Sequence, residues 1–406
     1  MLPETAGGWK IGTRPINIVL AGITRTTGQG VADEMTPICA LGLMSGTSMD
    51  GIDLAVLRTD GVSTLEIGPG LSVPYEVGFR KRLEGALETA KAIRIRDERP
   101  GDLAAIEREL TLLHADAVNR FLASDAARWG RPQLVGFHGQ TVLHRPHIGL
   151  TVQIGDGGLL AARTGLPVVY DMRANDMAHG GQGAPLVPAY HAVLARSLPP
   201  PFAGRYPVVF VNIGGISNIS YIPERGDPIA FDTGPGNALI DQWVAREGGV
   251  PFDADGAIAS EGAVHWNIVA GYLENPFFAR GGAKSLDRND FTLAGVEGLE
   301  LADGARTLAA LSAEAIMKAA DHLPETPGLW IVSGGGRKNP HILADLREKA
   351  EGAEVIPAED IGLSGDFTEA EAWAYLAVRA TRQLPLTWPS TTGCREAVTG
   401  GVLVKP

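Results

Sequence analysis

The chain has 406 residues, of which 45% are hydrophobic and 20% charged, and its formal net charge is −12. This length exceeds what one hydrophobic core normally holds, so we expect two lobes, and the composition excludes a disordered chain. The negative charge argues against nucleic acid or an anionic membrane as a partner, and the longest apolar stretches are too short to span a membrane. The two cysteines, Cys39 and Cys394, match no metal or redox spacing and favour a cytoplasmic protein.

Residues 1–37 are predicted to be a flexible N-terminal extension. The mildly apolar stretch Ile16–Ile23 is short for a signal peptide, and no clear cleavage site follows it. The extension could also precede a true start at Met35.

The first half of the chain predicts a β-meander followed by helices. Strands are expected at 40–44, 54–57 and around 71–77, and the second of two helices carries a buried stripe from Ile106 to Phe121. Later strands at 134–137 and 167–170 place His138 and Asp171 at their carboxyl ends.

The second half repeats this order. Strands are expected at 208–213, 217–222 and 228–231, then a helical stripe from Leu308 to Ala319, then a strand at 330–332. The repetition predicts a duplicated α/β fold with a cleft between two lobes. We place the first lobe at 38–165 and the second at 166–406, with a C-terminal segment able to pack back on the first lobe.

Two kinds of loop are candidates for binding phosphate groups. In Ser45–Asp53, glycines flank hydroxyls and carboxylates, so that backbone N–H groups can face phosphate oxygens while Asp50 positions a Mg²⁺ ion. Gly214 and Gly215 form the matching turn of the second half, and Gly334, Gly335 and Gly336 suit adenine or ribose against bare backbone. Ordinary turns would use the same residue types.

Asp232 is the candidate general base. An apolar strand places it at its tip, directly before the sharp turn Gly234-Pro235-Gly236, and a strand-tip carboxylate facing a cleft can accept a proton. A structural capping aspartate is an equally open interpretation.

Arg173 is the candidate side chain for an acidic ligand. It can bind a carboxylate through two hydrogen bonds, and the glycines at 180, 181 and 183 let the backbone approach a ligand closely. A solvated ion pair on a flexible loop is the alternative. We predict substrate contacts at a set of polar residues and a glycine from these loops: His138, Gln140, Thr141, Arg173, Gly181 and Gln182.

The sequence does not match several other functional motifs. The stretch Arg280–Ser285 is similar to the end of a P-loop, but Ala283 and Phe278 stand where that pattern needs glycine. The sequence contains neither the Rossmann glycine fingerprint nor a G-x-S-x-G nucleophile elbow, and His138, His144 and His147 match no common zinc spacing.

The sequence resembles the anhydro-N-acetylmuramic acid kinase family in order from about Ile38 to the C-terminus. The motifs that carry the resemblance are GLMSGTSMDGID (42–53), GFHGQTVLHRP (136–146), TVQIGDGGLLA (151–161), GGQGAPLVPAYH (180–191), NIGGISNIS (212–220), FDTGPGNALID (231–241) and LPLTWPSTTGC (384–394).

The resemblance implies an actin/hexokinase-like, ribonuclease H-like duplicated fold and an ATP- and Mg²⁺-dependent kinase. Its substrate would be 1,6-anhydro-N-acetylmuramic acid from cell-wall turnover, opened by water and phosphorylated on O6 in one reaction. The resemblance assigns Asp232 as the catalytic aspartate, and it assigns Arg173 and Glu369 to the sugar. It assigns the phosphates of ATP to Gly46, Thr47, Ser48, Met49, Asp50, Gly51, Ile52 and Asp53.

Two other functions stay open on the sequence alone. One is a hydrolase that opens the anhydro sugar without phosphoryl transfer, in which Asp171 or Asp176 would partner Asp232. The other is a non-catalytic actin-like module that binds ATP. A shift of two positions would also exchange Glu369 for Glu371. A homodimer is plausible.

Overall fold

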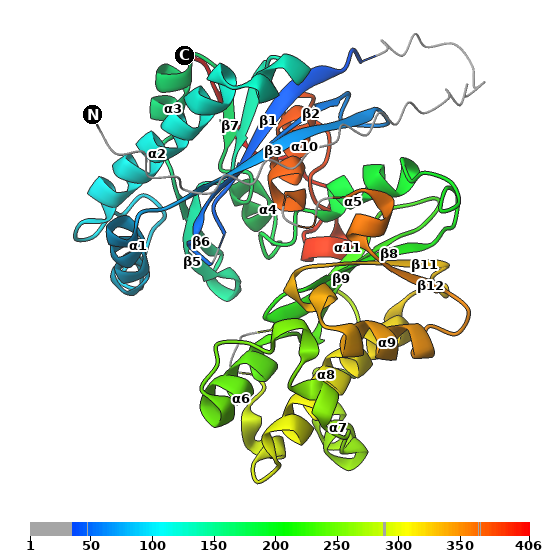
Figure 1. Ribbon diagram of the computed structural model, residues 1–406. Coiled ribbons are helices and arrows are strands. Elements are labelled where there is room, and N and C mark those ends of the chain that lie inside the picture. Colours follow the sequence, from blue (N-terminus) through cyan, green and yellow to red (C-terminus); the bar gives the residue numbers. More distant parts are fainter. Residues whose placement is uncertain (1–34, 47, 287–289, 364, 366) are drawn as a thin grey trace. The chain divides into compact units, whose positions relative to one another are not determined.

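Figure 1 shows the computed structural model of the protein, which describes residues 35–406 except 47, 287–289, 364 and 366. Most of the extension predicted at 1–37 therefore lies outside the described residues. The chain forms two compact units. Within the described residues, unit 1 comprises 35–197, 367–389 and Cys394–Pro406, and unit 2 comprises Leu198–Gly365 and Ser390–Gly393.

Unit 1 contains a six-stranded sheet in the order β13-β7-β4-β1-β2-β3. β1, β2 and β3 are antiparallel, β4 and β7 run parallel to β1, and β13 pairs antiparallel with β7. The strands are β1 Ile38–Met44, β2 Gly51–Thr59, β3 Leu65–Pro74, β4 Leu134–Phe137, β7 Val168–Tyr170 and β13 Val402–Val404. A separate hairpin is formed by β5 Gln140–Arg145 and β6 Leu150–Ile154.

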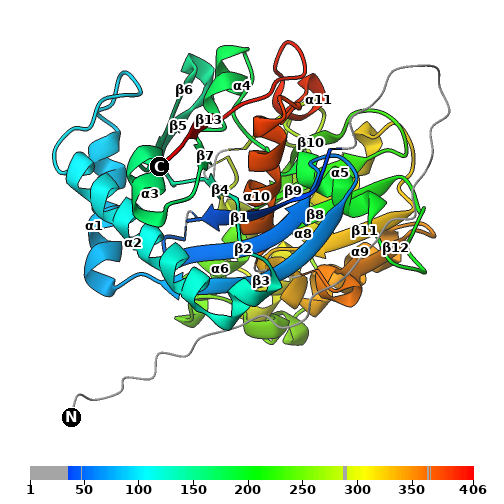
Figure 2. The same ribbon diagram turned by 90° about the horizontal axis from the view of Figure 1, so that it is seen from above.

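Helices cover both faces of this sheet. They are α1 Val77–Ala90, α2 Leu103–Ala123, α3 Gly157–Thr164, α4 Ala174–Ala178, α5 Pro188–Arg196 and α10 Thr368–Thr381. The main core joins α1, α2 and α3 to one set of alternate strand residues, which includes Leu41 and Leu43. α10 packs on the opposite face, against β1, β2 and β4 (Figure 2).

Two glycines let α10 lie directly on the sheet. A Cβ atom at Gly42 would be 1.7 Å from the Ala370 carbonyl oxygen, and one at Gly136 would be 2.1 Å from the Trp373 carbonyl oxygen. Both glycines belong to motifs that carry the family resemblance, and the structure gives both a packing role.

Unit 2 contains a five-stranded sheet in the order β10-β9-β8-β11-β12. β8, β9 and β10 are antiparallel, and β11 and β12 extend the sheet in parallel from β8. The strands are β8 Val208–Ile213, β9 Ile216–Ile222, β10 Ile229–Pro235, β11 Leu329–Ser333 and β12 Glu354–Pro357. The helices that build its core are α6 Ala238–Gly248, α7 Trp266–Leu273, α8 Leu301–Lys318 and α9 Pro340–Lys349 (Figure 1). The short α11, Pro389–Thr392, begins in unit 1 and ends in unit 2.

The two units share one topology. In each, three antiparallel strands in the order third, second, first continue into two parallel strands. This is the order of a ribonuclease H-like unit, so the chain has the duplicated α/β fold of the actin/hexokinase-like class, as predicted.

The division between the units differs from the predicted boundary near residue 165. The first unit continues to Ser197, because β7 pairs with β4 and α5 packs on α10. The C-terminal α10 and β13 belong to unit 1.

Two strands and one hairpin differ from expectation. The strand predicted to end at Phe231 is β10, which continues to Pro235, so Asp232 lies inside the strand, at a β-bulge between Asp232 and Gly234. The third strand runs over Leu65–Pro74 instead of 71–77, because the chain turns into α1 at Glu76. The hairpin β5–β6 was not predicted at all.

Candidate functional site

The loop between β1 and β2 in unit 1 is held by hydrogen bonds within the loop and by Gln140 of β5. The buried Ser45 hydroxyl donates to Gln140 Oε1 at 2.6 Å, and Gln140 Nε2 donates to the Gly46 carbonyl at 3.1 Å. The Ser48 hydroxyl donates to Asp50 Oδ1 at 2.7 Å, and Met49 has a φ of +49°. Gln140 therefore braces the loop from the start of β5.

The predicted phosphate loop divides into a turn and a strand. Gly51, Ile52 and Asp53 belong to β2, with Ile52 in the core and Asp53 Oδ1 accepting from Ser72 at 2.5 Å. Of the remaining turn at 46–50, Ser48 and Asp50 are exposed, Gly46 is half-buried and Met49 packs into the core, while Thr47 lies outside the described residues.

Arg173, at the amino end of α4, lies between His138 and the loop that precedes α5. Its Nη1 donates to the Gly183 carbonyl at 2.7 Å, its Nη2 lies 3.1 Å from His138 Nε2, and its guanidinium stacks 5.2 Å from the Trp373 ring centre. Its Nε is buried without a hydrogen-bond partner. Burial lowers the pKa of Arg173 to about 10, which leaves it charged.

His138 is a neutral acceptor in this arrangement. Its Nδ1 lies 2.8 Å from the Gly139 carbonyl, which requires a proton there, so Nε2 accepts from Arg173. Burial lowers the pKa of His138 well below its usual value, and the charge of Arg173 adds to this. The ring also lies 4.6 Å from Trp373.

The glycine-rich loop is held by Asp176. Its carboxylate accepts the Gly183 N–H at 2.7 Å, and a Cβ at Gly181 would be 2.1 Å from Asp176 Oδ2. Asp176 is therefore occupied with the loop, and Gln182 is a half-buried residue of that loop.

Glu369 and Glu371 have different surroundings. Glu371 is buried and accepts the Tyr190 hydroxyl at 2.7 Å, whereas Glu369 is exposed to solvent. Although Glu369 is accessible, loss of solvation raises its pKa most, and the charge of Arg173 opposes this shift. The structure thus places Glu369, and not Glu371, in the field of Arg173.

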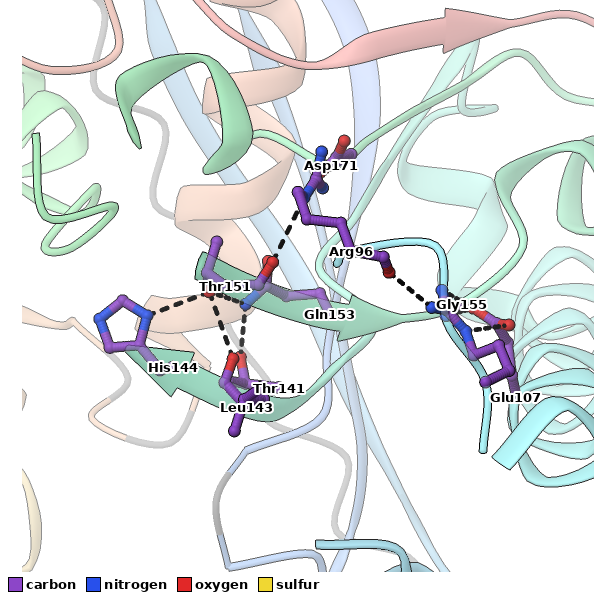
Figure 3. Close-up of polar contacts among 10 residues, drawn as sticks. Arg96, Glu107, Thr141, Leu143, His144, Thr151, Gln153, Gly155 and Asp171 are labelled. Atoms are coloured by element: carbon purple, nitrogen blue, oxygen red, sulfur yellow. Dashed lines mark hydrogen bonds and ion pairs between the residues drawn. The ribbon is translucent and has the colours of Figure 1, made fainter. Parts of the chain in front are cut away.

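Beside these residues lies a polar cavity of about 300 Å³ in unit 1, lined in part by His138, Gly139 and Gln153. Figure 3 shows how the β5–β6 hairpin builds this region: Gln153 Nε2 donates to Thr141 Oγ1 at 3.2 Å and to Thr151 Oγ1 at 2.8 Å. Thr141, predicted to contact substrate, is engaged in this network.

An ion pair and a hydrogen bond to a carboxylate border the same cavity. Arg96 joins Asp171 at 2.5 Å and also donates to the Thr151 carbonyl, while Glu107 accepts the Gly155 N–H at 2.9 Å (Figure 3). Asp171 has a φ of +56°, and it directly precedes the segment that carries Arg173. Of Arg96, Glu107 and Asp171, only Asp171 was singled out from the sequence.

In unit 2, three glycine turns converge. The Gly214–Gly215 turn accepts the N–H groups of Gly236 and Asn237 at 2.9 and 2.7 Å. Cβ atoms would meet the Ile213 carbonyl at 2.6 Å from Gly334 and the Ile213 side chain at 2.2 Å from Gly336. The turns at 214–215, 234–236 and 334–336 therefore lie close together, and of their glycines Gly215 and Gly335 expose backbone; these turns are called the glycine surface below.

Asp232 lies on β10, next to these turns. Its N–H donates to the Lys284 carbonyl at 3.0 Å, and its Oδ2 accepts the Leu286 N–H at 2.8 Å. Burial raises the pKa of Asp232 to about 6, and the Leu286 N–H partly offsets this. Such a carboxyl group is ionised at neutral pH and remains a useful proton acceptor.

The described residues contain no group of three or more His, Cys, Asp or Glu side chains arranged to hold a metal. In the same residues, no helix has both the length and the apolar composition needed to cross a membrane.

Two ribonuclease H-like units in one chain, with Asp232 inside a strand beside converging glycine turns, define a protein of the actin/hexokinase-like class. More narrowly, the chain belongs to the anhydro-N-acetylmuramic acid kinase family, whose sequence model matches residues 39–406.

Curated relatives agree over nearly their whole length. The anhydro-N-acetylmuramic acid kinase of Brucella suis (strain ATCC 23445 / NCTC 10510) is 58% identical over 369 residues, covering 90% of this chain and 98% of that protein. The protein of the same description from Agrobacterium fabrum is 58% identical over 368 residues, with the same coverage.

Solved structures are more distant. A ROK family glucokinase from Streptomyces griseus, in complex with glucose and AMPPNP, is 16% identical with a TM-score of 0.36, covering 84% of this chain and 99% of that chain. The sheet order of each unit and the family membership, rather than this similarity, carry the fold assignment.

Proposed function

We propose that this protein uses ATP to open 1,6-anhydro-N-acetylmuramic acid with water and to phosphorylate O6, giving N-acetylmuramic acid 6-phosphate and ADP in cell-wall recycling. The observation that carries the proposal is Asp232: a half-buried carboxylate on β10, fixed by a backbone N–H, in a chain that belongs to this kinase family.

Asp232 would act as the general base. It would accept a proton from the water that attacks the anomeric carbon, and the released O6 would attack the γ-phosphate of ATP. A pKa of about 6 suits this role, because the group is ionised at neutral pH without being a very weak base. Most of the remaining acceleration would come from positioning and charge neutralisation.

The sugar would be bound by polar groups of unit 1. The Arg173 guanidinium keeps a buried Nε–H without a partner, and Glu369 is an accessible carboxylate in its field. A carboxylate of the ligand would suit Arg173, and ligand hydroxyls would suit Glu369. The substrate contacts predicted at 138, 140, 141, 181 and 182 remain proposals, and the side chains of His138, Gln140 and Thr141 are hydrogen-bonded within unit 1.

ATP would be bound by the 46–50 loop and by the glycine surface of unit 2. The Mg²⁺ ion would be held mainly by phosphate oxygens and water, with Asp50 as the protein carboxylate, which is a common arrangement for Mg²⁺ and needs no cluster of three protein ligands. When bound, Mg²⁺ neutralises charge on the phosphates. A cytoplasmic location and a homodimer remain predictions.

The test is ADP release by the purified protein with ATP, Mg²⁺ and 1,6-anhydro-N-acetylmuramic acid. We expect sugar-dependent ADP release with formation of a phosphorylated reducing sugar. Asp232→Asn should lower kcat by about 10²- to 10⁴-fold, the range of general-base contributions. Asp321→Asn, an exposed aspartate of the same unit, is the matched control and should keep the wild-type rate.

The other functions predict different products. A hydrolase would form N-acetylmuramic acid without ADP, and a non-catalytic module would bind ATP without turning over the sugar. Full activity of Asp232→Asn would remove Asp232 as the base.

A further inference from the structure

Lys284 is a buried lysine in the segment whose P-loop resemblance failed. Its side chain is 9% exposed, and its Nζ donates to the carbonyls of Arg280 at 2.7 Å and Phe277 at 3.3 Å. The ammonium also lies 4.6 Å from the Phe277 ring centre and 5.3 Å from that of Phe231. Carbonyl oxygens and aromatic faces both favour a cation, so they compensate for lost hydration.

The backbone that carries this lysine holds Asp232 at two points. The Lys284 carbonyl accepts the Asp232 N–H at 3.0 Å, and two residues further on the Leu286 N–H donates to Asp232 Oδ2 at 2.8 Å. The first contact fixes the strand at Asp232, and the second fixes the direction of its carboxylate.

We propose that Lys284 is a positioning residue for Asp232: its side chain ties the 284–286 segment to the turn at 277–280 and so holds the Leu286 N–H on the carboxylate. This inference rests on the proposed role of Asp232 as the base. Lys284 touches neither substrate in this role, because its ammonium is used by carbonyls and rings.

The groups around the Lys284 ammonium are carbonyls, aromatic rings and two other basic side chains. Burial lowers the pKa of Lys284, and the nearby charge of Arg280 lowers it further. Two other basic groups lie against these rings in the described residues. The Arg280 guanidinium lies 5.4 Å from the Phe277 ring centre, and the His322 ring lies 6.4 Å from Phe231, with its Nε2 2.7 Å from the Phe278 carbonyl. Burying a charged group costs free energy unless the group is hydrogen-bonded or paired, and here the two carbonyls and the two rings meet this condition.

The experiment is the pH dependence of kcat from pH 5 to 8.5 for the wild type and Lys284→Met. Methionine keeps the length of the side chain and removes the hydrogen bonds and the charge. A donor to a carboxylate favours the ionised form, so losing the Leu286 contact should raise the midpoint of the acidic limb by about one pH unit. At pH 6, kcat should fall several-fold to about tenfold relative to the wild type, and at pH 8 it should recover.

Lys318→Met, a half-buried lysine at the end of α8, is the matched control and should leave the midpoint in place. A merely structural loss would reduce the amplitude at every pH without moving the midpoint. An unmoved midpoint in folded Lys284→Met would therefore overturn the proposal.

If Lys284→Met does not fold, the same pH dependence of kcat is measured for Phe277→Leu. It keeps the lysine and removes one ring face, so we expect a smaller shift of the midpoint in the same direction, and no shift would overturn the proposal. Failure of the base assignment is distinguishable, because Asp232→Asn would then stay active whatever Lys284→Met does.

Discussion

At the scale of single residues, α10 carries two glutamates whose side chains have different surroundings. Glu369 remains accessible in the field of Arg173, whereas Glu371 is enclosed between α10 and α5 with the Tyr190 hydroxyl as its donor. The sequence could not separate them, since both lie in the first turn of the helix and an error of two positions exchanges them. Their distinction depends on Tyr190, which is 181 residues away in the chain.

The buried Glu371 predicts a pH-dependent stability. Burial raises its pKa to about 7 from a usual value of 4.5, with the Tyr190 hydroxyl partly opposing this. The folded state therefore binds the extra proton between these values, so this contribution is fully present below pH 4.5 and is lost as the pH rises to about 7. Between pH 5 and 7.5 the loss amounts to about 2 kcal/mol.

Glu371→Gln tests this. Glutamine can still accept from Tyr190 and does not titrate, so the variant should lack this part of the decline in the free energy of unfolding between pH 5 and 7.5. Denaturant titrations at both pH values measure the difference. Glu88→Gln, which changes an exposed glutamate of α1, is the comparison and should leave the pH dependence of the wild type unchanged. Parallel pH profiles for the wild type and Glu371→Gln would contradict the assignment.

At the scale of elements, the contact between α10 and the sheet of unit 1 depends on missing side chains. Gly136→Ala would place a Cβ 2.1 Å from the Trp373 carbonyl oxygen, with no flexible side chain that could yield. We expect overpacking to lower the free energy of unfolding of unit 1 by about 1–3 kcal/mol, or by more where the helix cannot shift.

The chain offers a control of the same chemistry. Gly85 lies in α1, and a Cβ there would have no atom within 4 Å. Gly85→Ala should be neutral or stabilising by up to about 1 kcal/mol, because alanine favours the helix. Denaturation midpoints followed by the fluorescence of tryptophan compare the two. Equal midpoints for both variants would show that α10 does not need Gly136.

Elements were predictable where the local pattern was unbroken. Residues 208–213 form an uninterrupted β-rich run, and β8 has the predicted bounds. β3 begins six residues before the predicted strand. Its first six residues include Gly68, Pro69 and Gly70, which indicate a turn, so the sequence pattern does not predict a strand there. Gly68 and Gly70 instead make room for the rings of Trp129 and Phe367, which no local pattern shows.

The site was predictable to the same extent. The glycine turns and the strand that carries Asp232 follow from local sequence, although β10 continues past Asp232 to Pro235. The contacts that orient Asp232 come from Lys284 and Leu286, more than 50 residues later, and their backbone groups leave no mark in side-chain patterns. Arg96 was missed for the same reason, since its partner Asp171 is 75 residues away.

At the scale of the whole molecule, the two units differ in how the chain builds them. Unit 2 is almost contiguous, with its five-stranded sheet and its core within 198–365 and a short return at 390–393. Unit 1 is not, because α10 reaches its sheet only after the chain has completed unit 2. We therefore expect unit 2, and not the N-terminal part of unit 1, to fold alone.

Two fragments test this expectation. Fragment 198–365 has the size of an ordinary domain and should unfold cooperatively in denaturant, with a small loss from the missing hydrogen bond, 2.7 Å long, between Ser390 and the Pro228 carbonyl. Fragment 35–197 lacks α10, which leaves bare backbone at Gly42 and Gly136 open to water, and should give no cooperative transition. Adding a peptide of residues 366–389 should restore one. A cooperative transition in fragment 35–197 alone would show that the sheet of unit 1 is stable before α10 arrives, and that α10 contributes Glu369 to the site rather than stability to the fold.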